Sequence, residues 1–283
     1  MPLLTELNLY PVKSCAGISL REATLTPAGL MSQHIYDREW MIVDENWQAL
    51  TQREYPKMAL IEPRIKADTL ELRSPGMLRF EIPLDLPDPA DEKVVRVKIW
   101  DDEVDAYDCD DTTALWFSNV LGTTCRLVRF HPNAQRLANK EWTNELEAPT
   151  LFSDGFPMLV IGIGSLDDLN EKLVAQGRSA LPNNRFRPNL VFSDIAPFEE
   201  DFAISYKIGD ASLKSVKPSP RCPIPSIDQA SGEFGPDPLD ILQTYRTNPK
   251  LDDRITFGMN TILLSGEGQV IRVGQNVEVE LDF

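Results

Sequence analysis

The sequence predicts a β-rich α+β fold with barrel-like sheets. Most patterned segments are short runs of alternating or β-branched residues, and turn residues separate them. Only three segments have the features of helices, so predicted strands outnumber predicted helices throughout. With 283 residues, 42% of them hydrophobic, the chain can form one large domain or two modest ones.

The first half of the chain is predicted to consist mainly of strands, at 3–9, 18–26, 40–51, 69–74, 77–83 and 93–100. Residues 83–92 are a predicted loop, because their prolines cannot donate a backbone hydrogen bond to a sheet. The first predicted helix covers 111–122, with Asp111 or Thr112 as its N-cap and Gly122 as its left-handed stop. A strand at 125–130 and an aperiodic polar stretch follow, so we expect a domain boundary within 120–150.

The second half is predicted to mix strands with two helices. Strands are expected at 158–163, after Asn189, at 260–265 and 269–274 around the turn GEG, and at 277–283. A helix is predicted over 165–177, where Ser165 and Asp168 form a capping box and three leucines share one face. Another is predicted over 237–246, with Asp237 as its cap and Pro238 in the first helical position.

Charge and composition exclude several classes of function. Lys and Arg number 28 against 44 Asp and Glu, so the net charge is −16, which disfavours nucleic acid or a membrane as the main partner. An anionic ligand requires a pocket where arginines gather. The N-terminus lacks the pattern of a secretory signal, and no apolar run is long enough to span a membrane. The four cysteines have neither metal-site nor redox-motif spacing, which predicts free thiols in a cytoplasmic protein.

One cysteine stands in an unusual setting, the stretch PSPRCPIPSID at 218–228. The prolines around Cys222 exclude it from a helix interior or a central strand and predict a stiff loop. Arg221 beside it favours the thiolate, which is the form that binds metals and attacks electrophiles. A buried loop cysteine that only packs is an equally good interpretation of this stretch alone. Cys109 and Cys125, in or beside predicted strands, are interpreted as small apolar core residues.

Other candidate motifs have ordinary interpretations. GIGSLDDL at 162–169 follows a strand and opens a helix, but Asp167 replaces the third glycine of a dinucleotide loop. Two carboxylates there would repel a pyrophosphate, so a capped helix is the better interpretation. His34 and His131 are the only histidines, and neither has the spacing of a zinc site, so we interpret both as structural or surface residues.

Six motifs in the same order along the chain resemble a known family. They are YPVKSCAG (10–17), DREW (37–40), LTQREYPKMALI (50–61), RFRPNLV (185–191), RCPIPSIDQASGEF (221–234) and DPLDILQTYR (237–246). The set is similar to MOSC-domain proteins preceded by a MOSC N-terminal β-barrel domain, which include YcbX-like bacterial proteins and mitochondrial amidoxime-reducing components. This resemblance implies a β-barrel-like domain over 1–122 and a MOSC β-barrel domain with a few peripheral helices over 123–283.

The resemblance also implies a binding site for a molybdenum–molybdopterin cofactor. Cys222 matches the protein ligand to molybdenum, and Asp154 matches an acidic residue close to the metal, although SDG at 153–155 is also a plain turn signal. The positions that match contacts to the pterin and its phosphate are Lys13, Ser14, Arg38, Arg187, Asn189 and Arg221. The IPSID segment after Cys222 differs from relatives with non-proline residues there, which affects the expected shape of the loop.

The implied reaction is the two-electron reduction of an N–O bond in a small N-hydroxylated substrate. Many bacterial relatives carry a C-terminal iron–sulfur domain, whereas no cysteine follows Cys222 here. We therefore expect a separate electron donor, such as a ferredoxin, a flavoprotein reductase or a b-type cytochrome, and the charge of −16 favours a donor with a basic surface. Two alternatives are a cofactor- or sulfur-handling protein with a persulfide on Cys222, and a non-catalytic binding module.

Overall fold

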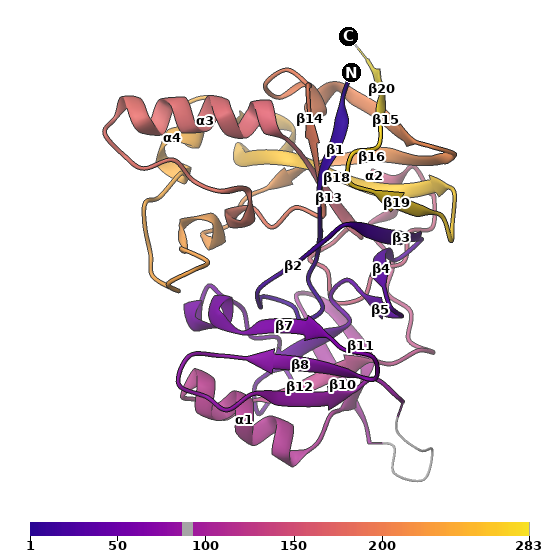
Figure 1. The fold of residues 1–283 in the computed structure, drawn as a ribbon, viewed down its shortest axis with the longest axis vertical. Helices are drawn as coiled ribbons and strands as arrows, with labels where there is room; N and C mark the ends of the chain where they lie inside the picture. The colour runs from indigo at the N-terminus through magenta and orange to yellow at the C-terminus, as the bar shows by residue number, and fades with distance from the viewer. Residues whose placement is uncertain (87–92, 283) are drawn as a thin grey trace.

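The computed structural model describes residues 1–86 and 93–282 and divides them into an upper and a lower lobe (Figure 1). The N-terminus and the end of the last strand lie close together at the top of the upper lobe. Strands dominate, which confirms the predicted β-rich α+β class. The helices of the described residues are α1 (Asp111–Leu121), α2 (Lys140–Thr143), α3 (Ile163–Ala175), α4 (Leu239–Gln243) and the 3-10 turns η1 (Pro56–Leu60), η2 (Asn183–Arg185), η3 (Glu199–Phe202), η4 (Ile224–Ser226) and η5 (Pro249–Leu251).

The largest sheet forms the upper lobe, and eight of its strands run in the order β2-β1-β14-β13-β18-β16-β15-β20, with β17 paired to β18. Among the described residues of this sheet, β13 and β14 pair in parallel and the other strand pairs are antiparallel. The strands are β1 (Leu3–Leu9), β2 (Ile18–Leu20), β13 (Met158–Gly162), β14 (Leu190–Ser193), β15 (Ala203–Ile208), β16 (Ala211–Pro220), β17 (Thr247–Asn248), β18 (Arg254–Ser265) and β20 (Glu278–Leu281).

Three smaller sheets complete the molecule. The lower lobe holds the sheet β10-β11-β12-β6 and the sheet β7-β8-β9, and a third sheet, β19-β3-β4-β5, lies between the lobes (Figure 1). Their strands are β3 (Glu22–Thr26), β4 (Gly29–Ser32), β5 (Ile35–Tyr36), β6 (Trp40–Val43), β7 (Glu62–Ile65), β8 (Thr69–Arg73), β9 (Phe80–Pro83), β10 (Val94–Ile99), β11 (Asp102–Asp108), β12 (Arg126–Phe130) and β19 (Val270–Arg272).

The two halves of the chain exchange strands. β1, from the N-terminus, pairs with β14 in the upper sheet, and β19, from the C-terminal region, pairs with β3. β12 pairs with β6 and β11 in the lower lobe. One hydrophobic cluster extends across both lobes, from Leu4 to Phe117 and Leu213. The domain boundary at 122/123 remains a prediction. Strand pairing between the N-terminal and C-terminal parts of the chain joins any such domains.

Several predicted strands have different bounds in the structure. The predicted strand 18–26 is two strands, β2 and β3, which belong to different sheets. The predicted strand 40–51 ends at Val43 because Asp44 closes a turn, its side chain accepting hydrogen bonds from the amides of Asn46 and Gln48 at 2.8 Å. Residues 87–92 of the predicted loop and Phe283 of the last predicted strand lie outside the described residues.

The predicted helix caps are wrong in detail. α1 is capped by Asp110, whose side chain accepts from the Thr113 amide at 2.7 Å, rather than by either of the next two residues. Gly122 ends α1 in the left-handed conformation, as predicted. α4 begins at Leu239 and has Pro238 at its cap position, although the Asp237 side chain still accepts from the Leu239 amide at 2.9 Å.

The proline-rich stretch is partly strand rather than loop. Pro218 and Pro220 lie within the last three residues of β16, where the strand pairs with β18 alone, since its pairing with β15 covers only 211–214. Register shifts between β16 and β18 accommodate them, since a bulge removes the need for a ladder donor at each position. Cys222 lies beyond the strand in irregular backbone, as predicted.

A buried glutamate, not the predicted capping box, completes the start of α3. The helix begins at Ile163, so Ser165 lies inside it, and the Ser165 hydroxyl donates to the Glu200 carboxylate, both of whose oxygens lie 2.7 Å away. Glu200 also accepts from the Gly162 amide at 3.3 Å. The carboxylate therefore bonds the helix N-terminus from a segment far away in sequence, which no local motif indicates.

Glu200 provides a prediction about stability. The residue is fully buried, and desolvation raises the pKa of its carboxyl to about 7. The folded protein then keeps this proton up to about pH 7, whereas the unfolded chain loses it near 4.5. Stability should therefore fall as pH rises from 4.5 to 7, by roughly 3 kcal/mol from this group. Urea unfolding at pH 5 and pH 8 should show a smaller pH effect in Glu200→Gln than in the wild type; parallel profiles would contradict the assignment.

Candidate cofactor-binding site

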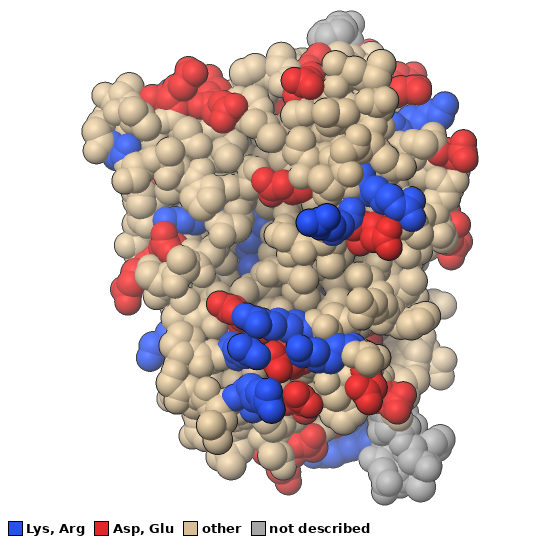
Figure 2. All heavy atoms as spheres, in the orientation of Figure 1, with Lys and Arg blue, Asp and Glu red and all other residues tan. Residues whose placement is uncertain are grey.

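A cavity of about 450 Å³ lies between the lobes and receives residues from both. Figure 2 shows Lys and Arg atoms recessed in the hollow between the upper and lower parts of this face. All eight residues predicted for the site line the cavity: Lys13, Ser14, Arg38, Asp154, Arg187, Asn189, Arg221 and Cys222. The fold thus gathers residues that are separated by more than 200 positions in the sequence.

Strand β1 leads into the segment that carries the first two side chains of the site, Lys13 and Ser14. Beyond its end, the chain is held against the start of β6, where the Lys13 amide donates to the Trp40 carbonyl at 2.8 Å and the Arg38 amide donates to the Tyr10 carbonyl at 2.7 Å. Ser14, Arg38 and Arg187 have φ of 64°, 53° and 56°. Left-handed backbone is uncommon outside glycine and often occurs at functional sites.

Tyr10 separates two of the site's guanidinium groups. The Cζ atoms of Arg38 and Arg187 lie 4.4 and 4.3 Å from the centre of the Tyr10 ring. The Tyr10 hydroxyl donates to the Pro188 carbonyl at 3.2 Å. Burial raises the pKa of Tyr10 to about 12, so the ring stays neutral and serves as a cation–π partner for both arginines.

Asn189 fixes Arg38 rather than pointing a free amide into the cavity. Its Oδ1 accepts from Arg38 Nη1 and from the Leu159 amide, both at 3.2 Å, and its Nδ2 donates to the Asn8 carbonyl at 3.1 Å. The side chain thereby ties the segments around β1, β13 and β14 to one arginine. Arg38 also forms an ion pair with Asp37, which is fully buried.

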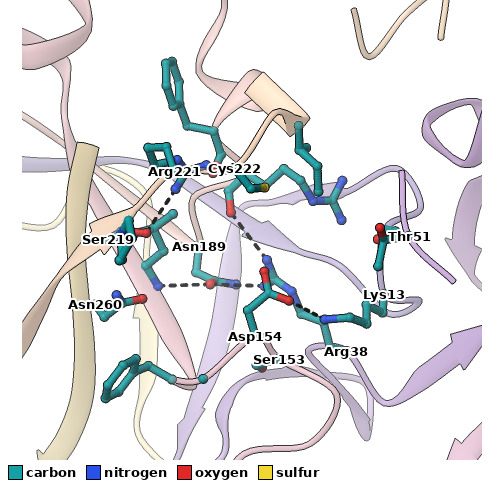
Figure 3. Close-up of a pocket in the computed structure, with 18 of the residues that line it drawn as sticks. Lys13, Arg38, Thr51, Ser153, Asp154, Asn189, Ser219, Arg221, Cys222 and Asn260 are labelled. Atoms are coloured by element: carbon teal, nitrogen blue, oxygen red, sulfur yellow. Dashed lines mark hydrogen bonds and ion pairs between the residues drawn. The ribbon is translucent and has the colours of Figure 1, made fainter. Parts of the chain in front are cut away.

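Lys13 and Asp154 form an ion pair at the cavity wall (Figure 3). Lys13 Nζ also donates to the Phe152 carbonyl at 3.0 Å. Burial lowers the pKa of Lys13, although Asp154 opposes the shift. Burial would raise the pKa of Asp154, but the charge and hydrogen bond of Lys13 outweigh it and hold this pKa below its usual range. Asp154 is therefore an ionised carboxylate at the cavity wall.

Cys222 lies just after β16 and also lines the cavity. Figure 3 shows Cys222 and Asp154 around the same opening. The Arg221 amide donates to the Ile255 carbonyl at 2.8 Å, which anchors the loop to β18. The Arg221 side chain donates to Ser219 Oγ at 3.1 Å and to the Phe186 carbonyl at 2.9 Å. Cys222 is half-buried and lines the cavity, which favours a thiol that meets a ligand over a cysteine that only packs.

The other thiols and both histidines lie elsewhere. Burial raises the pKa of Cys15 and of Cys109 to about 12, which leaves them unreactive, and Cys125 is buried in the same core cluster. All four cysteines are free, as predicted. Neither histidine lines the cavity. Within residues 1–86 and 93–282, no group of three or more His, Cys, Asp or Glu side chains could hold a metal ion.

The charges around the cavity favour an anionic ligand. Among its described lining residues, seven cationic side chains face a single carboxylate, that of Asp154. The cations are Lys13, Arg38, Arg53, Arg187, Lys217, Arg221 and Arg254. In these cavity-lining side chains, three guanidinium nitrogens are buried without a hydrogen-bond partner among the described residues: Arg53 Nε, Arg187 Nη2 and Arg221 Nε. Buried donors left unpaired are costly, and a phosphate or another anion would satisfy them.

Several functional candidates were missed from the sequence. Arg53 and Trp100 line the cavity together, with the Arg53 Cζ 4.4 Å from the Trp100 ring centre. Arg53 belongs to the motif LTQREYP, which could have indicated it. Lys217, Arg254 and Asn260 also line the cavity, with no signal in their local sequence.

Arg136 is a buried anchor for the segment that carries Asp154. Its Nη1 donates to the carbonyls of Leu151 and Ser153 at 3.0 and 2.6 Å, and its Nε donates to Asp102 at 2.7 Å. Arg136 lies in the polar stretch that follows the predicted strand at 125–130, where the local sequence gives no reason to select it.

Fold and cavity together define a β-rich protein whose two lobes enclose a cationic pocket with one accessible thiol. Residues 1–124 match the MOSC N-terminal beta barrel domain, and residues 147–278 match the MOSC domain. The chain is 32% identical over 247 residues to mitochondrial amidoxime reducing component 2 of Bos taurus, covering 86% of this chain and 72% of that protein. It is 31% identical to mitochondrial amidoxime-reducing component 1 of Mus musculus, covering 86% and 71%.

A molybdenum cofactor sulfurase of Danio rerio is also similar, at 31% identity over 90% of this chain and 31% of that protein. The chain therefore belongs to the family of MOSC-domain proteins with an N-terminal MOSC β-barrel domain, to which the mitochondrial amidoxime-reducing components are related. In the described part of the chain, every helix is too short or too polar to traverse a lipid bilayer.

Proposed function

We propose that this protein is a molybdenum-cofactor-dependent reductase of N-hydroxylated compounds. One observation carries the proposal: the half-buried thiol of Cys222 opens into a cavity lined by cations of both lobes, with three unpaired guanidinium nitrogens. A soft thiolate suits molybdenum, and the unpaired donors suit a phosphate-bearing pterin. The names of the relatives support amidoximes as a substrate class.

In this proposal the residues divide into three roles. Cys222 is the protein ligand to the metal. Lys13, Ser14, Arg38, Arg187 and Arg221 hold the pterin and its phosphate, and Asn189 contributes by fixing Arg38 through the 3.2 Å contact. Asp154 stays ionised beside Lys13, so its carboxylate can accept a hydrogen bond from an N–H group of the substrate and orient the N–O bond. When bound, the cofactor supplies the two-electron redox chemistry.

The electrons would come from a separate donor, a ferredoxin, a flavoprotein reductase or a b-type cytochrome. The net charge of −16 favours a donor with a basic docking surface. Reduction rates with such a donor should then fall as ionic strength rises from about 0.01 M to 1 M, because salt screens the attraction. A rate that does not change with salt would contradict this steering.

A cytoplasmic location is also proposed, on the basis of the four free thiols, although the related amidoxime-reducing components are named as mitochondrial.

The direct test combines composition and activity. Protein produced in a host that makes molybdenum cofactor should contain molybdenum and pterin in equal amounts and, with a chemical reductant, should convert an aromatic amidoxime to the amidine. Protein that contains both but does not turn over any N-hydroxylated compound would refute the reductase.

The similarity to a molybdenum cofactor sulfurase favours a second candidate function, that of a sulfur carrier. The thiol of Cys222 in the cavity lining also suits a sulfur carrier. Mass spectrometry that finds a persulfide on Cys222 in protein without molybdenum would support that function instead.

A further inference from the structure

Three cations of the cavity, Arg53, Lys217 and Arg254, have no part in the proposed cofactor site, and Lys217 and Arg254 belong to paired strands of the upper sheet. Lys217 lies on β16 and Arg254 begins β18, and both line the cavity. The proposed cofactor contacts use other residues, so these two charges face the cavity without an assigned ligand.

Their positions come from the strand ladder that also delivers Cys222. Lys217 pairs with Asn260, whose Nδ2 donates to the Lys217 carbonyl at 3.1 Å. At the other end of the ladder, the Arg221 amide bonds the Ile255 carbonyl, next to Arg254. Lys217 and Arg254 therefore flank the stretch of backbone that ends at the thiol, and Asn260, opposite Lys217, adds a side-chain amide to the cavity lining.

Neither charge is neutralised by the protein. Among the described residues, Lys217 and Arg254 make no ion pair, whereas Lys13 and Arg38 each have a carboxylate partner. Lys217 Nζ lies 4.7 Å from the centre of the Trp142 ring. Partial burial lowers the pKa of Lys217, and the charge of Arg254 lowers it further, while Glu141 opposes both. In a chain with 44 acidic residues, two such cations facing one cavity indicate a ligand that brings its own negative charge.

We propose that Lys217 and Arg254, assisted by Asn260, bind a carboxylate or phosphate group on the substrate. The inference rests on the proposed reductase function and specifies its substrate class: N-hydroxylated compounds that carry an anionic group apart from the N–O bond. The reaction consumes two electrons from the donor and two protons, breaks the N–O bond, and releases the amidine or amine and water. The anionic group is unchanged, because it serves only to bind and orient the substrate.

The test uses cofactor-loaded protein and two substrates that differ in one group, benzamidoxime and 4-carboxybenzamidoxime. The wild type should favour the carboxylated substrate in kcat/KM by roughly tenfold or more, the scale of one charge-assisted hydrogen bond. In the double variant Lys217→Gln, Arg254→Gln this ratio should fall toward one. The matched control is Lys214→Gln, Arg272→Gln, which removes the same charge outside the cavity and should keep the wild-type ratio.

A binding measurement separates this inference from the reductase function. Calorimetry with the products, benzamidine and 4-carboxybenzamidine, should show the same roughly tenfold preference without turnover, and the cavity double variant should lose it. Turnover of both substrates with no preference would overturn the inference and leave the reductase intact. Failure to reduce either of the two amidoximes would refute the reductase function. Calorimetry would still test whether Lys217 and Arg254 bind the carboxylate. Loss of molybdenum from the double variant would assign the pair to the cofactor phosphate and also overturn the inference.

Discussion

Cys222→Ala should abolish molybdenum retention and reduce the turnover of N-hydroxylated compounds by more than ~100-fold, since even residues that merely support a metal ligand typically contribute 10- to 100-fold. The fold should survive, because Cys222 lies in irregular backbone beyond β16 and is only half-buried, so that its truncation leaves no core cavity. Elemental analysis, activity and thermal unfolding of the purified variant test the three parts separately.

Cys109→Ala is the matched control for this experiment. It removes a thiol of similar exposure that lies outside the cavity, at the edge of the core, and it should keep both metal and activity. Full molybdenum content and full turnover in Cys222→Ala would show that this thiol is not the ligand, and the central assignment of the site would have to be withdrawn.

Arg187→Ala should weaken cofactor binding by about 1.5–3 kcal/mol, which corresponds to about 10- to 150-fold in affinity. Arg187 is buried, and its Nη2 has no hydrogen-bond partner among the residues that the structure describes. Burial lowers the pKa of Arg187, so these residues by themselves stabilise its positive charge poorly. Cofactor occupancy measured under limiting cofactor supply should therefore drop sharply.

The stability of the cofactor-free Arg187→Ala protein should change little. The substitution loses the stacking on Tyr10 but also removes a desolvated charge, and these effects oppose each other. Arg178→Ala is the control, since Arg178 lies outside the cavity and makes its ion pair with Asp240 and its hydrogen bond to the Asp237 carbonyl at the surface. Equal occupancy in the Arg187 and Arg178 variants would mean that Arg187 does not contact the cofactor.

Most of the fold class was readable from local patterns. Alternation identified strands such as β1, β8 and β10, and the leucine spacing of α3 identified its buried face, because these signals depend only on neighbouring residues. The errors have local causes as well. The turn at Asp44 shortened a strand, and the register shifts at Pro218 and Pro220 admitted prolines into β16.

The sequence by itself determined the residue types of the site, the loop position of Cys222 and the family to which the chain is related. Only the tertiary structure decided that eight predicted residues share one cavity, that Asn189 acts on Arg38, and that Lys217, Arg254 and Arg53 line the same cavity. The physical reason is that motifs report short-range backbone and side-chain preferences. The pairing of β1 with β14 and of β16 with β18 joins segments far apart in sequence, and the desolvated, unpaired charges exist only once those strands are joined.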